Sequence, residues 1–518
     1  MPAGGDTRFA LALTGAFVLL ASVPVVFHEP WRDELQAWLI ARDATGFLSL
    51  LRNLRYEGHP GLWHLVLMPL TRLGGPRLMA ALNLAFAAGV VFLFARFSPF
   101  GRAIRVLFPF GYFPLYEWGA IARNYALGVF FLFLFAALFP RRERHPLLLG
   151  VVLALAANSS VHAAIVAVGA LALLVAERRA PWRDRGAAVR PVAFWAGIGL
   201  GVAGVGASVL QVLPPAGCAV PGIFASHGIG ERLGRALSSL VHGFAPIPWQ
   251  IELTRFHWLQ VAQVAAGIAF TVAFVVAAGL SLVRRRAAWI VAALPVSALL
   301  YLFCAHYYGG ARHASFMLVA TMIALWLAPL FPERVVRSER LARASGLADR
   351  RLAGIMATTL AFHLVGAAIA TGVDVRMVFS AAPATAALIR ERGLAELPMV
   401  ADPDWSASNV VAQLGKPAAY YANVDRWGSF MVQDSRHGRH GKYTRAPADD
   451  FVFGQAVSLA RATDVVVLLD HEPRRESVTA AGASLVGSRR ADVWRDESFW
   501  VYLVPMARRA EARSAPSR

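Results

Sequence analysis

The sequence predicts a polytopic α-helical membrane protein with about eleven transmembrane segments, followed by a soluble C-terminal α/β domain. Hydrophobic residues make up 57% of the 518 residues, charged residues make up 16%, and the mean hydropathy is +0.51. Apolar runs of about 20 residues, long enough to cross roughly 30 Å of hydrocarbon as a helix, recur through most of the chain. Only short apolar runs follow residue 375. We therefore expect a membrane region at 1–374 and an α/β domain at 375–518.

The membrane region contains a series of candidate spans. The second and fourth are short and contain proline, which favours tilted, broken or partly re-entrant helices. The sixth is long and includes the polar stretch 158–162. The candidates are 9–27, 61–73, 76–97, 103–118, 120–140, 147–176, 190–213, 258–283, 287–307, 313–331 and 352–373.

The net charge of +19 comes largely from arginines in short loops between apolar runs. The positive-inside rule places Arg and Lys in such loops, so the charge indicates topology and argues against nucleic-acid binding. With the basic segments 177–190, 284–286 and 333–351 in the cytoplasm, 214–257, 307–312 and everything after 374 lie on the outer face of a plasma or inner membrane. Counting eleven spans from a cytoplasmic N-terminus gives the same answer and also places 28–60 on the outer face.

One basic loop conflicts with this topology. The same count of spans places 141–145, with three arginines, on the outer face. Either this loop is an exception, or 147–176 is a broken pair of helices and a shorter span has been counted wrongly. The sidedness of 98–146 therefore stays open at the level of sequence.

An acidic pair, Asp33 and Glu34, lies between the first and second spans. Two adjacent carboxylates so close to hydrocarbon cost solvation energy, and this placement points to catalysis. The alternative is that Asp33 only N-caps a helix that begins at Glu34.

The loop 28–60 that carries the acidic pair also contains two amphipathic patterns. Apolar residues recur at helical spacing in each, with arginines between them, so two short interfacial helices are expected to roof a cavity. A lipid would enter this cavity from the bilayer and a second substrate from water. The apolar positions are Leu35, Trp38 and Leu39 in the first pattern and Phe47, Leu50, Leu51 and Leu54 in the second.

These features together resemble the GT-C superfamily of integral-membrane glycosyltransferases. The superfamily includes protein O-mannosyltransferases and lipid A aminoarabinose transferases, which use polyprenyl-phosphate sugars. The resemblance covers about 1–375 and rests on Asp33-Glu34, the interfacial helices after it, Glu57-Gly58-His59-Pro60 and the many spans. It implies a catalytic role for Asp33, with Glu34 beside it. The stretch from Glu117 to Tyr125 departs from the mannosyltransferase pattern, which leaves the role of Glu117 open.

The expected chemistry is inverting single displacement of a sugar from polyprenyl phosphate to a hydroxyl of a glycan, lipid or protein. A carboxylate must accept the proton of the acceptor hydroxyl, and cations must stabilise the phosphate that leaves. We expect Asp33 to be the base and Arg312 and Arg123 to bind the phosphate, because guanidinium groups match phosphate oxygens. The alternatives are that Arg312 only reaches the interface and that Arg123 is an ordinary positive-inside residue.

Further substrate contacts are expected from polar residues beside these groups, namely Glu57, His59, Tyr125, Tyr308 and His313. The histidine spacings match no zinc motif, so neither a metal nor another cofactor is predicted. If a divalent ion is bound, as in some GT-C relatives, Glu57 and His313 are the candidate ligands. Another lipid-linked transferase or ligase of the cell envelope and a secondary transporter remain as alternative functions.

The C-terminal segment has the pattern of a small α/β domain on the outer face of the membrane. Strands are expected at 397–400 and 465–469, and helices at 381–392 and 450–462. The segment could bind the acceptor, although a fold alone assigns no function.

Overall fold

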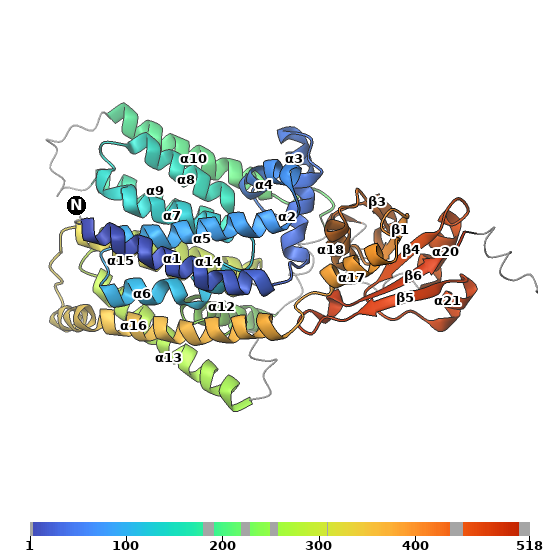
Figure 1. Ribbon diagram of the computed structural model, residues 1–518. Coiled ribbons are helices and arrows are strands. Elements are labelled where there is room, and N and C mark those ends of the chain that lie inside the picture. Colours follow the sequence, from blue (N-terminus) through green and yellow to red (C-terminus); the bar gives the residue numbers. More distant parts are fainter. Residues whose placement is uncertain are drawn as a thin grey trace, which may run out of the picture.

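The computed structural model describes residues 4–179, 191–218, 228–248, 257–307, 309–435 and 449–506. Long helices lie side by side in a bundle, and an α/β region follows at one end of it (Figure 1). The N-terminus lies at the opposite end of the bundle, so the molecule has a sheet end and an N-terminal end.

Eight helices in the described part of the chain are long and apolar enough to cross a membrane, and two shorter apolar helices, α7 and α8, pack among them. These observations confirm the multi-pass helical class. The eight are α1 (Gly4–Phe27), α5 (Arg77–Phe97), α9 (Val161–Arg178), α10 (Pro191–Val212), α13 (His257–Leu282), α14 (Arg286–Ala305), α15 (Ala311–Leu327) and α16 (Glu339–Arg376). The shorter pair is α7 (Tyr125–Leu138) and α8 (Pro146–Ser159).

Three of the candidate spans are not single transmembrane helices. The second forms α4 (Leu62–Leu73), which is too short to cross a bilayer. The fourth is broken into α6 (Arg102–Phe110) and a π-helical turn (Phe113–Glu117). The sixth is split at Ser160 into α8 and α9.

The break at Ser160 is stabilised locally and by a neighbouring helix. Its backbone is extended, and its hydroxyl oxygen accepts a hydrogen bond from the amide of Ala163 at 3.1 Å, which caps α9. The Asn124 side-chain amide donates to the carbonyl of Ser159 at 2.7 Å. Two of the backbone groups at the break, the Ala163 amide and the Ser159 carbonyl, therefore have partners inside the protein, as a membrane interior requires.

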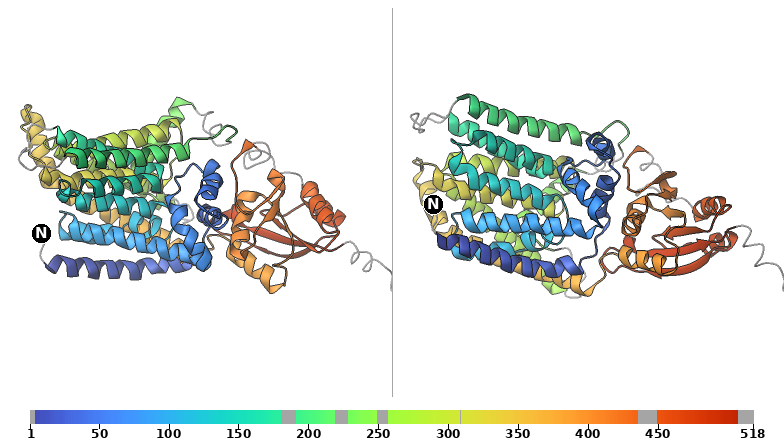
Figure 2. Two further views of the ribbon diagram at one scale, coloured as in Figure 1. Left: turned by 90° about the horizontal axis from the view of Figure 1, so that it is seen from above. Right: turned by 45° about the horizontal axis from the view of Figure 1, so that its top comes forward.

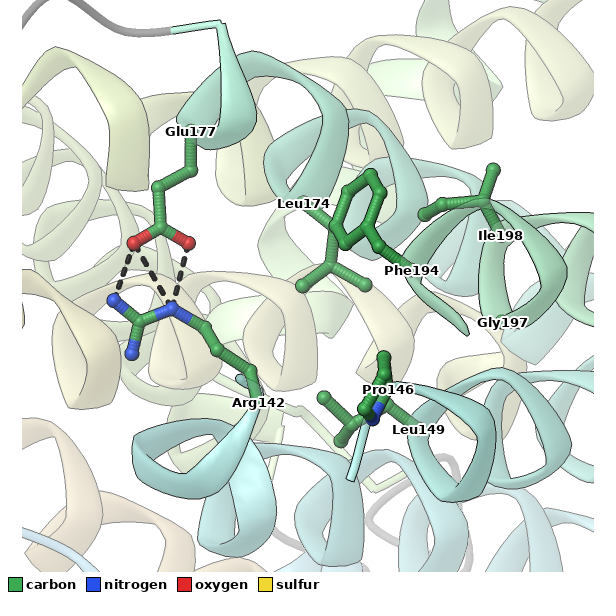
Figure 3. Close-up of a pocket in the computed structure, with 8 residues that line it drawn as sticks. All are labelled: Arg142, Pro146, Leu149, Leu174, Glu177, Phe194, Gly197 and Ile198. Carbon is green, nitrogen blue, oxygen red and sulfur yellow. Dashed lines mark hydrogen bonds and ion pairs between the residues drawn. The ribbon is translucent and has the colours of Figure 1, made fainter. Parts of the chain in front are cut away.

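The split of the sixth candidate resolves the conflict over 141–145. α8 and α9 form a hairpin, and Arg142 pairs with Glu177 at the end of α9, with Nε 2.7 Å from Oε2 (Figure 3). At the same N-terminal end Arg96 donates to Thr7 at 2.8 Å, and Arg285 pairs with Glu333 at 2.6 Å. The described basic segments thus share one end of the bundle (Figure 2). The broken pair is the correct alternative, and α4 is the short span that was counted wrongly.

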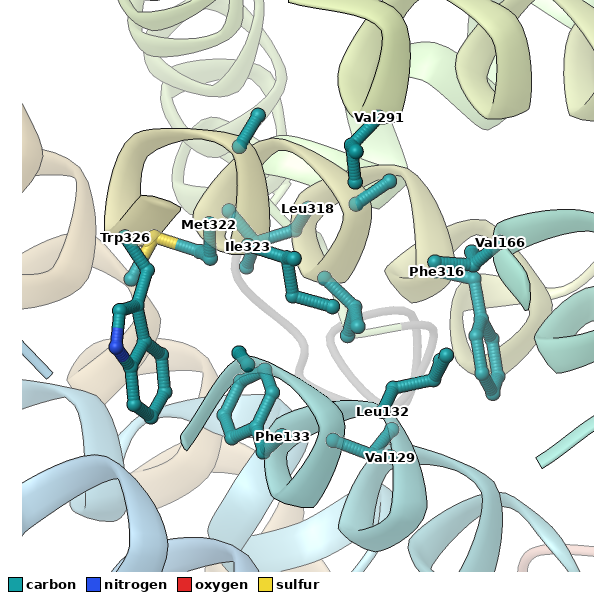
Figure 4. Close-up of a cluster of buried hydrophobic side chains, with 14 of the residues drawn as sticks. Val129, Leu132, Phe133, Val166, Val291, Phe316, Leu318, Met322, Ile323 and Trp326 are labelled. Atoms are coloured by element: carbon teal, nitrogen blue, oxygen red, sulfur yellow. The ribbon is translucent and has the colours of Figure 1, made fainter. Parts of the chain in front are cut away.

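α15 is the central helix of the bundle. Its residues 313–327 are all buried, and side chains of α7, α9 and α14 pack around it (Figure 4). Aromatic and branched aliphatic side chains fill this core, among them Leu132, Phe133, Val166, Val291, Phe316 and Trp326. At the edge of the bundle α8 and α10 approach so closely that a Cβ atom on Gly150 would lie 2.1 Å from the carbonyl oxygen of Gly197.

The expected outer loop 214–257 contains a helix, α12 (Ile229–Phe244), that the sequence analysis did not predict. It packs along α14 and α15, and the carbonyl of Phe244 accepts a hydrogen bond from His363 Nε2 of α16 at 2.8 Å. The segment therefore enters the bundle rather than lying on it. Small residues and Phe244 form its buried face, whereas Leu233 and Leu237 are exposed, so the sequence shows no continuous apolar run there.

The C-terminal region is a six-stranded mixed sheet covered by helices on both faces. Its strand order is β3-β2-β1-β4-β6-β5, with β1 parallel to β2 and β4 and the other pairs antiparallel. The strands are β1 (Met399–Asp402), β2 (Ala419–Tyr421), β3 (Arg426–Gly428), β4 (Val465–Leu469), β5 (Ser484–Arg489) and β6 (Phe499–Val504).

Successive side chains of each strand point to opposite faces of the sheet, so this region has one hydrophobic core on each face. Met399 and Ala401 face α17 (Ala382–Glu391) and α18 (Asp404–Leu414), whereas Val400 faces α20 (Asp449–Leu459) and α21 (Arg475–Ala480). Gly415 ends α18 in a left-handed conformation, with φ of 72°, which favours glycine. The predicted α/β character is confirmed, including strands at 399–402 and 465–469.

The buried carboxyl group of Asp402 predicts that the stability of the sheet region depends on pH. The residue is fully buried, and neither carboxylate oxygen has a hydrogen-bond partner of good geometry among the described residues. Burial, followed by the neighbouring Asp470, raises the pKa of Asp402 from 3.8 to about 8. The folded chain therefore keeps a proton that the unfolded chain releases, and stability falls as the pH rises through this window.

We expect Asp402→Asn to raise the Tm of the full-length protein more at pH 8 than at pH 5. Each unit of pKa shift corresponds to about 1.4 kcal/mol, so the difference should be easily measured by intrinsic fluorescence on heating. An equal change in Tm at the two pH values would contradict the assignment.

Candidate active site

The acidic pair lies in the first turn of α2 (Arg32–Arg42) at the sheet end of the bundle. Because the helix begins at Arg32, Asp33 is inside the helix and does not N-cap it. Residues 34–41 are all buried, and α2 packs against α4 and α18. Only the second expected interfacial helix, α3 (Phe47–Asn53), exposes apolar side chains, with Phe47 and Leu48 largely accessible.

Glu34 is buried, and both of its carboxylate oxygens have hydrogen-bond partners inside the protein. Its Oε2 lies 2.8 Å from His28 Nε2, and its Oε1 accepts a hydrogen bond from the amide of Ala122 at 2.6 Å. His28 Nδ1 in turn lies 2.9 Å from Asp374 Oδ2, at the end of α16. Burial lowers the pKa of His28, but the charges of Glu34 and Asp374 outweigh it and raise the pKa to about 10. A protonated histidine thus ties the start of α2 to the last membrane helix.

Asp33 faces a different environment, with its side chain one-third exposed. Its Oδ2 accepts a hydrogen bond from Arg312 Nη2 at 2.7 Å, and its backbone carbonyl accepts one from Arg123 Nη1. The guanidinium of Arg312 also lies over the ring of Trp31, 5.5 Å from the ring centroid. The structure therefore brings together the carboxylate and both arginines that the sequence suggested, from three distant segments.

His59 and Glu57 lie beside this centre. His59 Nε2 is 3.3 Å from Arg123 Nη2, while Glu57 accepts a hydrogen bond from the side-chain amide of Gln36. Burial, followed by the charge of Arg123, holds the pKa of His59 well below its usual value. Burial raises the pKa of Glu57. An uncharged imidazole therefore lies next to the cationic groups.

Tyr125 and His313 contact each other across the bundle. The hydroxyl of Tyr125 lies 2.6 Å from His313 Nε2, and His313 Nδ1 accepts a hydrogen bond from the amide of Gly310 at 2.9 Å. The hydroxyl of Tyr307 is 3.1 Å from the same Nε2 atom. Tyr308, which the sequence also suggested, lies outside the described residues.

Glu117 belongs to a second buried acidic group. The hydroxyl of Tyr112 donates to Glu117 Oε1 at 2.7 Å, and the hydroxyl of Tyr116 donates to Asp374 Oδ1 at 3.0 Å. The π-helical turn that carries Glu117 is held by Asn83, whose amide donates to the carbonyl of Trp118 at 2.7 Å. The turn that carries Glu117 therefore also contacts Asp374, the partner of His28, through Tyr116.

The metal candidates Glu57 and His313 have different partners, Gln36 and Tyr125 respectively. Within the described ranges, no group of three or more His, Cys, Asp or Glu side chains is arranged to hold a metal ion. The donors that gather at Asp33 are guanidinium, imidazole and phenol groups, which suit an anionic and hydroxyl-rich substrate.

Comparisons with known proteins give one informative result. No family model matches the sequence, and no curated protein matches it. Among solved structures, the crystal structure of ArnT from Cupriavidus metallidurans bound to undecaprenyl phosphate matches 97% of this chain and 99% of its own. The TM-score is 0.53 at 11% sequence identity. The chain has the fold of ArnT.

The likeness to ArnT covers both the helical bundle and the sheet region, so it confirms the GT-C resemblance at the level of the fold. At 11% identity it concerns the fold alone. The positions of the individual site residues rest on the contacts described above.

In this ArnT-like fold the sheet region contacts the start of α2 directly. Arg32 Nη1 lies 2.5 Å from Asp496 Oδ2, and Glu497 Oε1 accepts a hydrogen bond from the Arg32 amide at 3.0 Å. Trp31 stacks on Trp494 with ring centroids 4.5 Å apart. Burial raises the pKa of Glu497 to about 7, although Arg32 acts in the opposite direction. The residues flanking Asp33 are thus fixed by the segment 494–497.

Proposed function

We propose that this protein is a glycosyltransferase that moves a sugar from a polyprenyl-phosphate donor to a hydroxyl acceptor. The observation that carries the proposal is the contact of Asp33 with Arg312 and Arg123 at one end of a membrane bundle with the ArnT fold. ArnT has been crystallised with undecaprenyl phosphate, whose phosphate is an anion on a long apolar chain. The site offers two guanidinium groups for such a phosphate and a carboxylate for the acceptor.

The proposed reaction is an inverting single displacement. Asp33 accepts the proton of the acceptor hydroxyl as its oxygen bonds to the anomeric carbon, and the bond from that carbon to the phosphate oxygen breaks. Polyprenyl phosphate leaves with the electron pair, and Arg312 and Arg123 stabilise its charge. The donor phosphate competes for the guanidinium of Arg312, which releases Asp33 for the acceptor.

The contacts of the acidic pair support two different proposed roles. Asp33 is partly exposed and is the proposed catalytic base, whereas both oxygens of Glu34 are engaged with His28 and Ala122. We therefore assign Glu34 to positioning the loop. Glu57, His59, Tyr125, Tyr308 and His313 remain proposed substrate contacts.

The charge distribution supports an outer-face site. The described basic loops share the N-terminal end of the bundle, and the positive-inside rule assigns that end to the cytoplasm. The site and the sheet region then lie on the outer face of a plasma or inner membrane, with 1–374 as the membrane region and 375–518 as an extracytoplasmic domain. Nucleotide sugars are absent there, so a lipid must carry the activated sugar.

Topology is tested by single-cysteine labelling with an impermeant maleimide, after Cys218 and Cys304 are replaced by serine. The first labelling site is Leu485→Cys, since Leu485 is 57% exposed on the sheet region. The second is Val335→Cys, since Val335 is 90% exposed at the opposite end of the bundle. We expect the first to react in intact cells or spheroplasts and the second only after permeabilisation. The reverse pattern would invert the topology.

The donor class is tested with the purified full-length protein. We expect turnover with undecaprenyl phosphate that carries a hexose or a pentose, and none with UDP- or GDP-sugars. Turnover with a nucleotide sugar alone would contradict the proposed function. Movement of a solute across proteoliposomes without group transfer would instead favour a transporter.

A further inference from the structure

His162 is a buried polar residue that the proposed mechanism does not use. It lies in the first turn of α9, two residues after the break at Ser160, and it is 4% exposed. Neither Nδ1 nor Nε2 has a hydrogen-bond partner among the described residues. An unmatched buried polar group costs roughly 1–3 kcal/mol, so two such atoms on one ring call for an explanation.

His162 lies between rings of the proposed site and two apolar rings, Phe316 and Phe303, whose centroids are 5.8 and 6.0 Å away. Its ring stacks on His313 with centroids 4.8 Å apart, and the rings of Tyr125 and Tyr307 lie 6.3 and 6.4 Å away. His313 directly follows Arg312, whose guanidinium holds Asp33. The free ring nitrogens therefore lie within the same polar group as the proposed phosphate and acceptor sites.

The helix break is what places this ring here. An unbroken helix through 147–176 would carry residue 162 in its middle, away from the end where Asp33 lies. The extended backbone of Ser160 instead turns the chain back, and Asn124, next to Tyr125, holds the turn through the carbonyl of Ser159 at 2.7 Å. Three polar residues, Asn124, Ser159 and Ser160, thus present His162 to the site.

We propose that His162 binds hydroxyl groups of the donor sugar and so forms part of its binding subsite. This inference rests on the proposed function. A neutral imidazole offers one donor and one acceptor, and neighbouring sugar hydroxyls offer both roles in return. The arginines bind the phosphate, which is common to all polyprenyl-phosphate donors. His162 binds the sugar, which differs from one donor to another.

The test compares binding of two probes to the full-length protein. One is undecaprenyl phosphate without a sugar, and the other is the undecaprenyl-phosphate sugar that the wild type turns over fastest. His162→Phe keeps a planar ring but removes both nitrogens. We expect it to raise the Kd of the sugar-bearing lipid at least about tenfold, the equivalent of one to two lost hydrogen bonds, and to leave the Kd of undecaprenyl phosphate unchanged. His162→Gln is expected to restore part of the difference.

Thermal stability separates this role from a structural one. Because the ring nitrogens of His162 have no partner in the described protein, His162→Phe should leave the Tm unchanged or raise it. His363 is a matched control, since it is buried in α16 and bonded to the Phe244 carbonyl. His363→Phe should lower the Tm without changing the ratio of the two Kd values.

Two results overturn the inference. One is an unchanged Kd ratio in His162→Phe, which would mean that water alone satisfies the ring. The other is an equal rise in the Kd of both probes together with a lower Tm, which would mean that His162 has a structural role. Neither result affects the proposed function, which fails only if the wild type uses no lipid-linked sugar.

Discussion

Asp33→Asn is expected to lower kcat by about 10²- to 10⁴-fold, because asparagine cannot accept the proton of the acceptor hydroxyl. The fold should persist, since asparagine can still accept a hydrogen bond from Arg312 and the side chain is partly exposed. Initial rates with a lipid-linked sugar, together with Tm, measure the two effects. The KM of the donor should change less than kcat, because the phosphate contacts remain.

Asp43→Asn provides the matched control for Asp33. Asp43 follows the same helix, pairs with Arg42 at 2.7 Å and is also partly exposed. We expect its activity to stay within about twofold of the wild type, because its carboxylate is bonded to Arg42 and Ser429 and to neither proposed phosphate-binding arginine. Near-normal turnover by Asp33→Asn would remove Asp33 from the mechanism and direct attention to Glu57 or Glu117.

Arg312→Ala is expected to have the second large effect, on the use of the donor. Removing one partner of a buried, hydrogen-bonded charge pair typically costs about 2–5 kcal/mol, which corresponds to a rise in donor KM on the order of 10²-fold or more. Arg312→Lys should restore the charge but not the planar fork, so recovery should be partial. Kinetics over a range of undecaprenyl-phosphate-sugar concentrations separates KM from kcat.

Arg52 offers a control for the loss of positive charge near the site. It is an exposed residue of α3, in the same segment 28–60 as Asp33. Arg52→Ala should change donor KM far less than Arg312→Ala. Equal effects of the two substitutions would mean that general electrostatic attraction, rather than a specific contact of Arg312, binds the donor.

The membrane class was predictable because length and hydropathy decide it. α1, α5, α13 and α14 are uninterrupted apolar runs, and no tertiary contact is needed to recognise them. The break at Ser160 was only one of two alternatives, because a single extended residue can interrupt an apolar run without changing its composition. α12 was missed because its apolar side chains form a stripe among arginines and glycines, which lowers its mean hydropathy.

The candidate site was likewise predictable only in part from the sequence. Asp33, Arg123 and Arg312 were suggested by residue type and position, and the structure places them together. The sequence did not suggest the contacts of His28 with Glu34 and Asp374. These residues are up to 346 positions apart and share no local motif. His28 offered one weak signal, a histidine directly after an apolar run. Contacts of this kind follow from the arrangement of whole helices, which no short window of sequence contains.

The contacts that fix the start of α2 also set an order in the biosynthesis of the site. Asp33 leaves the ribosome long before the groups that hold its neighbours, Asp374, Trp494 and Glu497, are synthesised. A nascent chain that has already inserted most of its helices therefore still lacks a positioned carboxylate. Products of premature termination before residue 494 would occupy the membrane without an assembled site. The proposed activity would therefore begin only after residues 494–497 have been synthesised and have reached α2.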